Sequence, residues 1–370
     1  MLRKKCPVPE HSSILRKKCS GTILISVLWI LVILTVLTVS LGHNTQVELA
    51  LVKHAIGKMK SRYAALAGIV YAKDRIRRDS SVSQDQEART QDTLYQCGVF
   101  LDDGESSEDA FGNIAVGDGN FDVQYMFTGD DGKKEEYHGL QDEERRINVN
   151  ALTFQNRNVL SALIAILGFD EETAKTVAYA VLDWKDEDDS PVDPAYGAED
   201  DYYGSMAIPY QCKNRPFDSA EELFLVRGMT QELYGALKDY VTVFPKQGTL
   251  QVNFDTASRV VLMALVRAMK EAVPDAGVSD MEALVEKILR YRLGEDGIPL
   301  TRDDRAVALN EMPLNAQERN LFLAMSQFRT YVSNYLRVRV RGVEPSRGAE
   351  TVIEAVVYRN DFSILSWQRN

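Results

Sequence analysis

Apolar residues form one uninterrupted run near the start of the chain and recur periodically after it. The run extends from Thr22 to Leu41 and contains no charged residue. At a rise of 1.5 Å per residue, about 20 residues of α-helix span roughly 30 Å, the thickness of the hydrocarbon core of a bilayer. The pattern therefore predicts one membrane-spanning helix, to which the rest of the chain is attached.

Three interpretations of this run remain open at this point. A cleavable secretory signal has a shorter apolar core of about 7–15 residues and a small-x-small cleavage site, and no such site follows Leu41. A plain single-pass anchor fits the length. A prepilin-type leader, which is basic and ends in glycine, is similar to Lys17-Lys18-Cys19-Ser20-Gly21 directly before the run. Six basic residues precede the run, which predicts a cytoplasmic N-terminus.

The helical pattern continues after the run as an amphipathic segment from His43 to about Arg78. No proline lies between Thr22 and Arg78, so one helix of roughly 85 Å is expected. A lipid-embedded half followed by a packed half is typical of pilins. We expect the second half to pack on a soluble domain through an apolar face with helical spacing, formed by Val52, Ile56, Met59, Tyr63, Leu66 and Val70.

A small strand region follows this helix. Residues 79–120 are rich in Ser, Asp, Gln and Gly and predict loops with one short helix. Residues 121–127 alternate apolar and polar positions, as a half-buried strand does. A turn is expected at 129–133, and 147–150 closes the region. His138 is expected in a loop.

Residues 151–327 are periodic in the manner of helices and contain few strand signals. A capping-box pattern, Ser219-x-x-Glu222, precedes one of the expected helices. The expected helical segments are 159–167, 172–184, 223–225, 231–241, 281–291 and 316–328.

A faint internal repeat divides this helical region. Ile147-Asn-Val-Asn150, followed by Val159-Leu-Ser-Ala-Leu163, is similar to Val252-Asn-Phe-Asp255, followed by Val261-Leu-Met-Ala-Leu265. The repeat predicts two related helical subdomains, at about 151–247 and 250–327.

The C-terminal stretch returns to strands. Three apolar residues from Leu336 to Val340 alternate with arginines at 337, 339 and 341, which we expect on a solvated sheet face. Further strands are expected at 351–358 and 362–367, with a turn at 342–348. The fold class is therefore α+β: a long N-terminal helix packed on a small antiparallel sheet, with a large all-α insertion. The expected divisions are 1–21, 22–41, 42–150, 151–327 and 328–370.

Composition narrows the function classes. The 370-residue chain has a formal charge of −11, which argues against a general nucleic-acid-binding protein. A helix–hairpin–helix pattern at 221–241 offers one arginine beside three glutamates, so no nucleic-acid partner is expected there. The four histidines belong to no catalytic constellation, and no enzymatic activity or zinc site is expected. Cys97 and Cys212 either form a disulfide or remain free thiols.

An acidic segment from Asp183 to Asp201 carries the most chemistry. It holds nine carboxylates and one lysine in nineteen residues. The carboxylates repel one another unless a cation binds between them. Calcium takes six to eight oxygen ligands and tolerates irregular loops. The segment is not an EF-hand, since Pro191 and Gly197 occupy the positions of the required glycine and glutamate. A solvated acidic loop is the alternative.

Several motifs together resemble the protein K family of minor pseudopilins from type II secretion. No single motif is decisive, but their order and spacing match over nearly the full length. They are Ser20-Gly21 before Thr22-Ile-Leu-Ile-Ser-Val-Leu-Trp29, Arg62-Tyr-Ala-Ala-Leu-Ala-Gly68, Arg146-Ile-Asn-Val-Asn150, Asp183-Trp184-x-Asp186-x-Asp188, Gly197-Ala-Glu-Asp-x-Tyr-Tyr203 and Glu221-Glu-Leu-x-x-Val-Arg-Gly228.

The resemblance implies a structural subunit at the tip of a periplasmic pseudopilus. A prepilin peptidase would cleave after Gly21 and leave Thr22 as the N-terminus. The expected partners are the I-type and J-type minor pseudopilins and the inner-membrane secretion platform, with a single inner-membrane span and a periplasmic C-terminal domain. Major pilins carry glutamate at mature position five, where this chain has Ser26, which suits a tip position.

The family is also similar to calcium-binding helical domains in the acidic segment. On this basis we expect calcium ligands among Asp183, Asp186, Asp188, Glu199 and Asp200. Two other functions stay open: a minor pilin of a type IV pilus-like filament, and a single-pass membrane-anchored periplasmic calcium-binding module.

Overall fold

The structure is a computed structural model that describes residues 20–82, 107–128, 133–297 and 304–369. The chain divides into two compact units, Met1–Gly57 and Lys58–Asn370. Residues 1–19 of the expected 1–21 leader, Cys97 and most of the turn expected at 129–133 lie outside the described residues.

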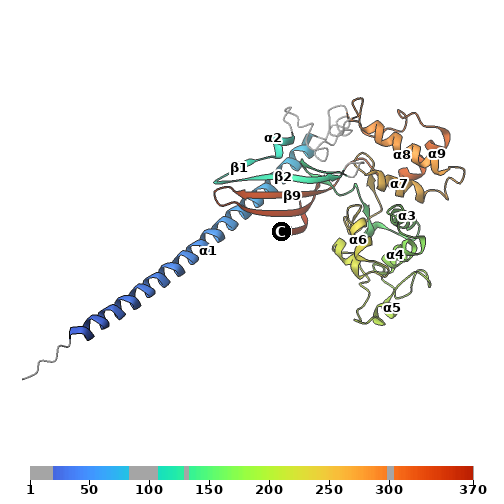
Figure 1. The fold of residues 1–370 in the computed structure, drawn as a ribbon. Helices are drawn as coiled ribbons and strands as arrows, with labels where there is room; N and C mark the ends of the chain where they lie inside the picture. The colour runs from blue at the N-terminus through green and yellow to red at the C-terminus, as the bar shows by residue number, and fades with distance from the viewer. Residues whose placement is uncertain (1–19, 83–106, 129–132, 298–303, 370) are drawn as a thin grey trace, which may run out of the picture. The chain divides into compact units, whose positions relative to one another are not determined.

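The longest element is helix α1 (Ser20–Val82), drawn in blue in Figure 1. It contains the predicted membrane run and continues without a break through the predicted amphipathic segment. Within the described residues, this is the one helix long and apolar enough to cross a membrane, with a mean hydropathy of 2.8 in its most apolar window. Gly21 and Thr22 lie in its first turn.

The face by which α1 packs on the sheet differs from the predicted one. Five of the six residues of the predicted stripe are exposed, among them Met59, Tyr63 and Val70 at 52%, 64% and 68%. Leu66 is partly buried against the core, so the prediction that this stripe packs on the soluble domain holds for Leu66 and is wrong for the other five. The buried positions carry mostly small side chains: Ser61, Ala64, Ala65, Ile69, Ala72 and Ile76. A methyl group on Gly68 would overlap Val340 and Phe121 of the sheet. Small residues therefore let the helix approach the sheet closely, and most of the larger apolar side chains of the predicted stripe face outward.

The sheet is antiparallel and has the strand order β1-β2-β9-β10-β11, with β3 added to β2 and β4 to β9. Its apolar face and the buried side of α1 enclose one core. The helix α2 (Ser107–Phe111) lies before the first strand. The strands are β1 (Ile114–Val116), β2 (Gly119–Thr128), β3 (Lys134–His138), β4 (Gln141–Asp142), β9 (Tyr335–Glu344), β10 (Ala349–Tyr358) and β11 (Ile364–Arg369).

Three details of this sheet correct the sequence-based expectations. Gly342 lies inside β9, so the turn is shorter than predicted and begins after Glu344. His138 ends strand β3 rather than lying in a loop. Arg337 is only partly solvated: its side chain is 27% exposed, and its guanidinium group pairs with Glu143 and Glu354. Side-chain pairing between strands thus replaces part of the solvation expected for this arginine.

The insertion between β4 and β9 is mainly helical and has its own large core. Ser219 makes no capping hydrogen bond, so the predicted capping box is wrong; instead, the Asp218 N–H donates to Glu222 at 3.1 Å. The helices are η2 (Val149–Ala151), α3 (Asn158–Ile166), α4 (Glu171–Asp183), α5 (Asp200–Gly204), η3 (Ala220–Leu225), α6 (Gln231–Leu237), α7 (Arg259–Ala268), α8 (Val278–Arg292), α9 (Ala316–Met325) and η4 (Ser326–Phe328).

Two short parallel strand pairs belong to the helical region, so the expectation that 147–150 closes the small strand region is wrong, and neither pairing was predicted. Strand β5 (Ile147–Asn148) pairs with β6 (Val241–Thr242), and β7 (Val252–Asn253) pairs with β8 (Arg329–Thr330). Val241 is therefore in a strand, and α6 ends earlier than the expected helix 231–241. Each pair lies at or just outside the two ends of one predicted subdomain.

The two repeat motifs make equivalent hydrogen bonds to the backbone of a later residue, Phe217 in the first subdomain and Val307 in the second. Asn150 accepts the Phe217 N–H at 2.8 Å and donates to the Phe217 carbonyl at 3.0 Å. In the second motif, Asp255 accepts the Val307 N–H at 2.7 Å, while Arg329 donates to the Val307 carbonyl. An aspartate and an arginine therefore do in the second subdomain what one asparagine does in the first.

Candidate metal centre

The acidic segment begins at the end of α4 and ends at the start of α5. Asp170 caps α4 by accepting the Thr173 N–H at 2.8 Å, and Asp183 is the last residue of the helix. The chain then forms an irregular loop and returns at Glu199, the N-cap residue of α5. This path brings the end of one helix and the start of the next together.

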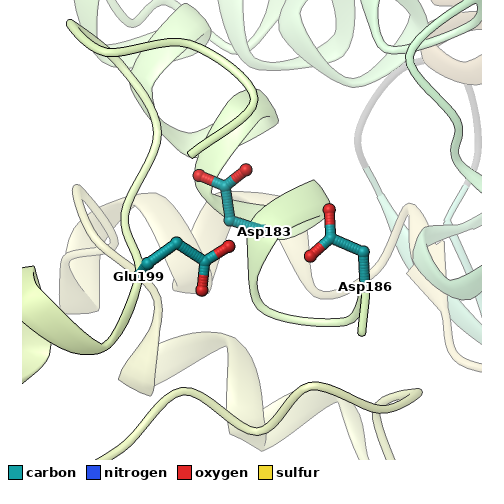
Figure 2. A group of neighbouring side chains, drawn as sticks. All are labelled: Asp183, Asp186 and Glu199. Carbon is teal, nitrogen blue, oxygen red and sulfur yellow. The ribbon is translucent and has the colours of Figure 1, made fainter. Parts of the chain in front are cut away.

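Three predicted ligands converge at this point: Asp183, Asp186 and Glu199. One carboxylate oxygen of each lies within 4.8 Å of the others, and Figure 2 shows the three carboxyl groups around a common space. Asp183 and Glu199 are only 0% and 4% exposed. Three acidic groups gathered in a buried place repel one another unless protons or a cation neutralise them.

Asp183 also shapes the loop. Its two carboxylate oxygens accept the N–H groups of Val192 at 2.9 Å and Ala198 at 2.5 Å. Gly197 lies so close to this carboxylate that a methyl group at its Cα would overlap it. The loop therefore needs glycine at this position, and Asp183 holds both of its ends.

The electrostatics of the centre favour neutralisation. Burial, followed by the charges of Asp183 and Asp188, raises the pKa of Asp186 to about 7. Burial, followed by the charges of Asp183 and Asp186, raises the pKa of Glu199 to about 8. These values lie well above those of free carboxyl groups, near 4.

Several buried carboxylate oxygens of the centre are left free to bind a cation. Both carboxylate oxygens of Glu199 and Oδ1 of Asp186 are buried and accept no N–H or hydroxyl hydrogen bond, while the Cys212 thiol, a weak donor, lies beside Glu199. Buried acceptors are almost always satisfied in folded proteins, so three orphaned oxygens in one place require an explanation. The donor set consists of oxygens, which hard cations such as Ca²⁺ prefer. The residues present therefore fit a bound calcium ion.

The other two predicted ligands are placed differently. The Asp200 carboxylate accepts the Cys212 N–H at 2.6 Å, and Asp188 accepts the Ser190 N–H at 2.8 Å. Neither belongs to the group of three. Lys185, the one lysine of the segment, points away and donates to the Leu152 carbonyl at 2.7 Å.

Sequence reasoning missed the apolar side of the centre. The Trp184 ring packs edge-on against Tyr203 at 5.2 Å between centroids and stacks with Phe217 at 6.4 Å. Tyr203 is fully buried and stacks with Tyr210 at 5.1 Å. Cys212 is buried, forms no disulfide with any described residue, and its thiol donates to the Asp183 carbonyl at 3.5 Å. These buried rings form an aromatic cluster next to the acidic segment, which the sequence pattern alone did not predict.

A comparison of the sequence with known protein families finds a match for the part of the chain that contains the centre. Residues 145–246, which include the whole centre, match the family model described as type II secretion system protein K. Type II secretion system protein K of Aeromonas hydrophila is 38% identical over 95 residues, or 26% of this chain and 28% of that protein. The Pseudomonas aeruginosa protein is 32% identical over 132 residues, or 34% and 38% of the two chains.

A longer match is found with protein K of Pectobacterium carotovorum, which is 29% identical over 138 residues. It covers 34% of this chain and 41% of that protein, so the matched stretches span less than half of these relatives. The fold is similar to a chain in the crystal structure of the GspK-GspI-GspJ complex from enterotoxigenic Escherichia coli, with a TM-score of 0.54, 21% identity and coverage of 84% and 98%. Residues 145–246 thus match the type II secretion system protein K family, and the α+β fold with its helical insertion is similar to that of a chain in the GspK-GspI-GspJ complex.

Proposed function

We propose that the chain is a minor pseudopilin at the tip of the type II secretion pseudopilus. In this role it is a structural subunit that helps to start the filament and so supports export of folded proteins. The observation that carries the proposal is the combination in one chain of α1, whose N-terminal half is apolar and exposed, with a protein K domain.

The proposed processing and location follow from the same helix. A prepilin peptidase would cleave after Gly21, and Thr22 would begin the mature chain in the first turn of α1. The apolar half would cross the inner membrane once, with the N-terminus in the cytoplasm, the domain in the periplasm and the secretion platform beside the span. A type IV pilus-like filament and an anchored calcium-binding module are the competing functions.

The proposed partners are the I-type and J-type minor pseudopilins, as in the complex named above. The full chain, extracted from membranes with detergent, should co-purify with both. Met59→Glu should abolish this association, because Met59 is an exposed apolar residue of α1 whose replacement leaves the core intact. Ile208→Glu is the matched control, since Ile208 is 83% exposed and lies in the helical region. Wild-type chain that captures neither partner would contradict the proposal.

We further propose that the three-carboxylate centre holds calcium. Asp183, Asp186 and Glu199 would hold the ion, and its charge would neutralise their mutual repulsion. The chain supplies the loop geometry through Asp183 and Gly197 and a buried aromatic cluster through Trp184 and Tyr203. Calcium would then fix the path from α4 to α5 and thereby the surface of this subdomain.

Stabilisation by calcium should grow strongly with pH. Without an ion, the raised pKa values of Asp186 and Glu199 stabilise the fold below about pH 4, and this contribution is lost as the pH rises through 7 and 8. Calcium must displace these protons. Its affinity should therefore fall roughly tenfold for each unit by which the pH is lowered, for each proton displaced. Thermal unfolding with calcium or a chelator, at pH 5.5 and pH 8.5, measures the difference. Equal shifts at both values would contradict this assignment.

A further inference from the structure

Three consecutive acidic residues lie where the helical insertion joins the sheet. The chain leaves the sheet after β4 through Asp142, Glu143 and Glu144, and it returns to β9 through residues 330–335. The three acidic residues are 2%, 0% and 4% exposed. Both connections between the sheet and the insertion therefore pass a buried cluster of carboxyl groups.

Hydrogen bonds through this cluster connect the sheet with the insertion. The Glu143 N–H donates to the Tyr335 carbonyl at 2.9 Å, and the Glu144 carbonyl accepts the Asn253 N–H at 2.8 Å. The Glu144 carboxylate accepts the Asn334 N–H, and Asp142 accepts the Thr256 hydroxyl at 2.7 Å. Both ends of the insertion are thus held by the same short segment.

The middle carboxylate is paired with cations. Glu143 pairs with Arg337 and with Arg146, the latter at 3.2 Å, and accepts the Thr242 hydroxyl at 2.5 Å. Burial opposes its ionisation, but the two guanidinium groups outweigh burial and lower the pKa of Glu143 to about 2. Glu143 therefore stays charged at any physiological pH.

The two flanking carboxylates receive only neutral donors among the described residues. Asp142 accepts the Glu144 N–H at 2.7 Å and the Thr256 hydroxyl, and Glu144 accepts backbone N–H groups. Neither forms an ion pair in this part of the chain. Burial, followed by the Asp142 charge, raises the pKa of Glu144 to about 8, and burial raises the pKa of Asp142.

Other charged and titratable groups surround Asp142 and Glu144, on the connecting segment itself and on and near the strands β9 and β10. Arg145, on the same connecting segment, offsets part of the rise that burial causes in the pKa of Asp142. Arg359, at the end of β10, is buried and donates to the Ser333 carbonyl at 3.0 Å. The remaining groups are Glu143, Arg146, Tyr335, Arg337 and Tyr358.

We propose that this junction is a proton-controlled hinge: while one of the two carboxyl groups, Asp142 or Glu144, is protonated, the helical insertion is held on the sheet, and when both are charged the junction loosens. Two buried anions that form no ion pair cost far more than one, because the interior screens their repulsion and solvates their charge poorly. Opening of the junction hydrates both carboxylates. A rise in pH thus shifts the population from the closed towards the open arrangement.

Hydrogen–deuterium exchange on the full detergent-extracted chain tests the hinge. We expect the protection factors of the Asn253 and Asn334 amides to fall roughly tenfold or more from pH 6 to pH 9, after correction for intrinsic exchange rates. Glu144→Gln keeps an oxygen acceptor for Asn334 and removes the charge, so protection should become independent of pH. Asp142→Asn should have the same effect.

A matched control uses a buried glutamate away from the junction. Glu318 is 2% exposed and pairs with Lys287 at 2.7 Å, so Glu318→Gln should leave the pH dependence at the junction unchanged. Flat protection of Asn253 and Asn334 in the wild-type chain would overturn the proposal without any variant. Protection at these amides that still depends on pH in Glu144→Gln or in Asp142→Asn would overturn the proposal equally.

Discussion

Replacing Glu199 by glutamine should abolish calcium stabilisation and, in the absence of calcium, raise the melting temperature at pH 8. The calcium effect disappears because a buried carboxylate that accepts no N–H or hydroxyl hydrogen bond is lost from the group of three. The chelated protein becomes more stable because one of three mutually repelling acids is neutralised. At a calcium concentration of about 100 times Kd, the wild-type chain should gain about 2.7 kcal/mol, or roughly 5–10 °C.

The two opposite effects separate loss of a ligand from damage to the fold, because damage would lower the melting temperature in both conditions. Asp201→Asn is the matched control: it removes a charge from the same segment at an exposed residue outside the group of three. It should retain the full calcium shift. A Glu199→Gln variant that still gains 5–10 °C with calcium, on the scale estimated above, would exclude Glu199 as a ligand.

Truncation of Glu143 to alanine should cost roughly 3–5 kcal/mol of unfolding free energy, which is a large fraction of the stability of a typical domain. Glu143 is fully buried and pairs with both Arg146 and Arg337. Its loss leaves two largely buried guanidinium groups without their shared counter-charge and removes the acceptor of the Thr242 hydroxyl. Urea unfolding followed by tryptophan fluorescence measures the change.

An exposed ion pair on the same strands provides the comparison. Glu350 pairs with Arg341 at 3.2 Å and its side chain is 51% exposed, so Glu350→Ala should cost at most about 1 kcal/mol. Similar losses for Glu143→Ala and Glu350→Ala would show that the buried network does not hold the junction.

The length of α1 followed from the sequence, but its orientation did not. Uninterrupted helical periodicity without proline was sufficient to predict a helix from Thr22 to Arg78. The rule that large apolar side chains face the core then selected Met59, Tyr63 and Val70, which are exposed. Close approach of the helix backbone to the sheet at Gly68 requires small residues, and hydrophobic periodicity does not report that requirement.

The metal centre shows a similar limit. The density of acidic residues located the segment, and three of the five expected ligands converge. The sequence did not distinguish Glu199 from its neighbour Asp200, because only the helix start at α5 turns one carboxylate inward and the other towards the Cys212 N–H. The buried acids at 142–144 gave no sequence signal, since Glu and Asp usually indicate solvated positions.

The most direct test of the pseudopilin assignment is the intact mass of the membrane-extracted chain, with and without the host's prepilin peptidase. The account predicts loss of residues 1–21 only when the peptidase is present, so that Thr22 becomes the N-terminus. A chain that keeps residues 1–21 in the presence of the peptidase, or that is cut near Gly42, would contradict it. The protein would then be an anchored or secreted calcium-binding module rather than a filament subunit.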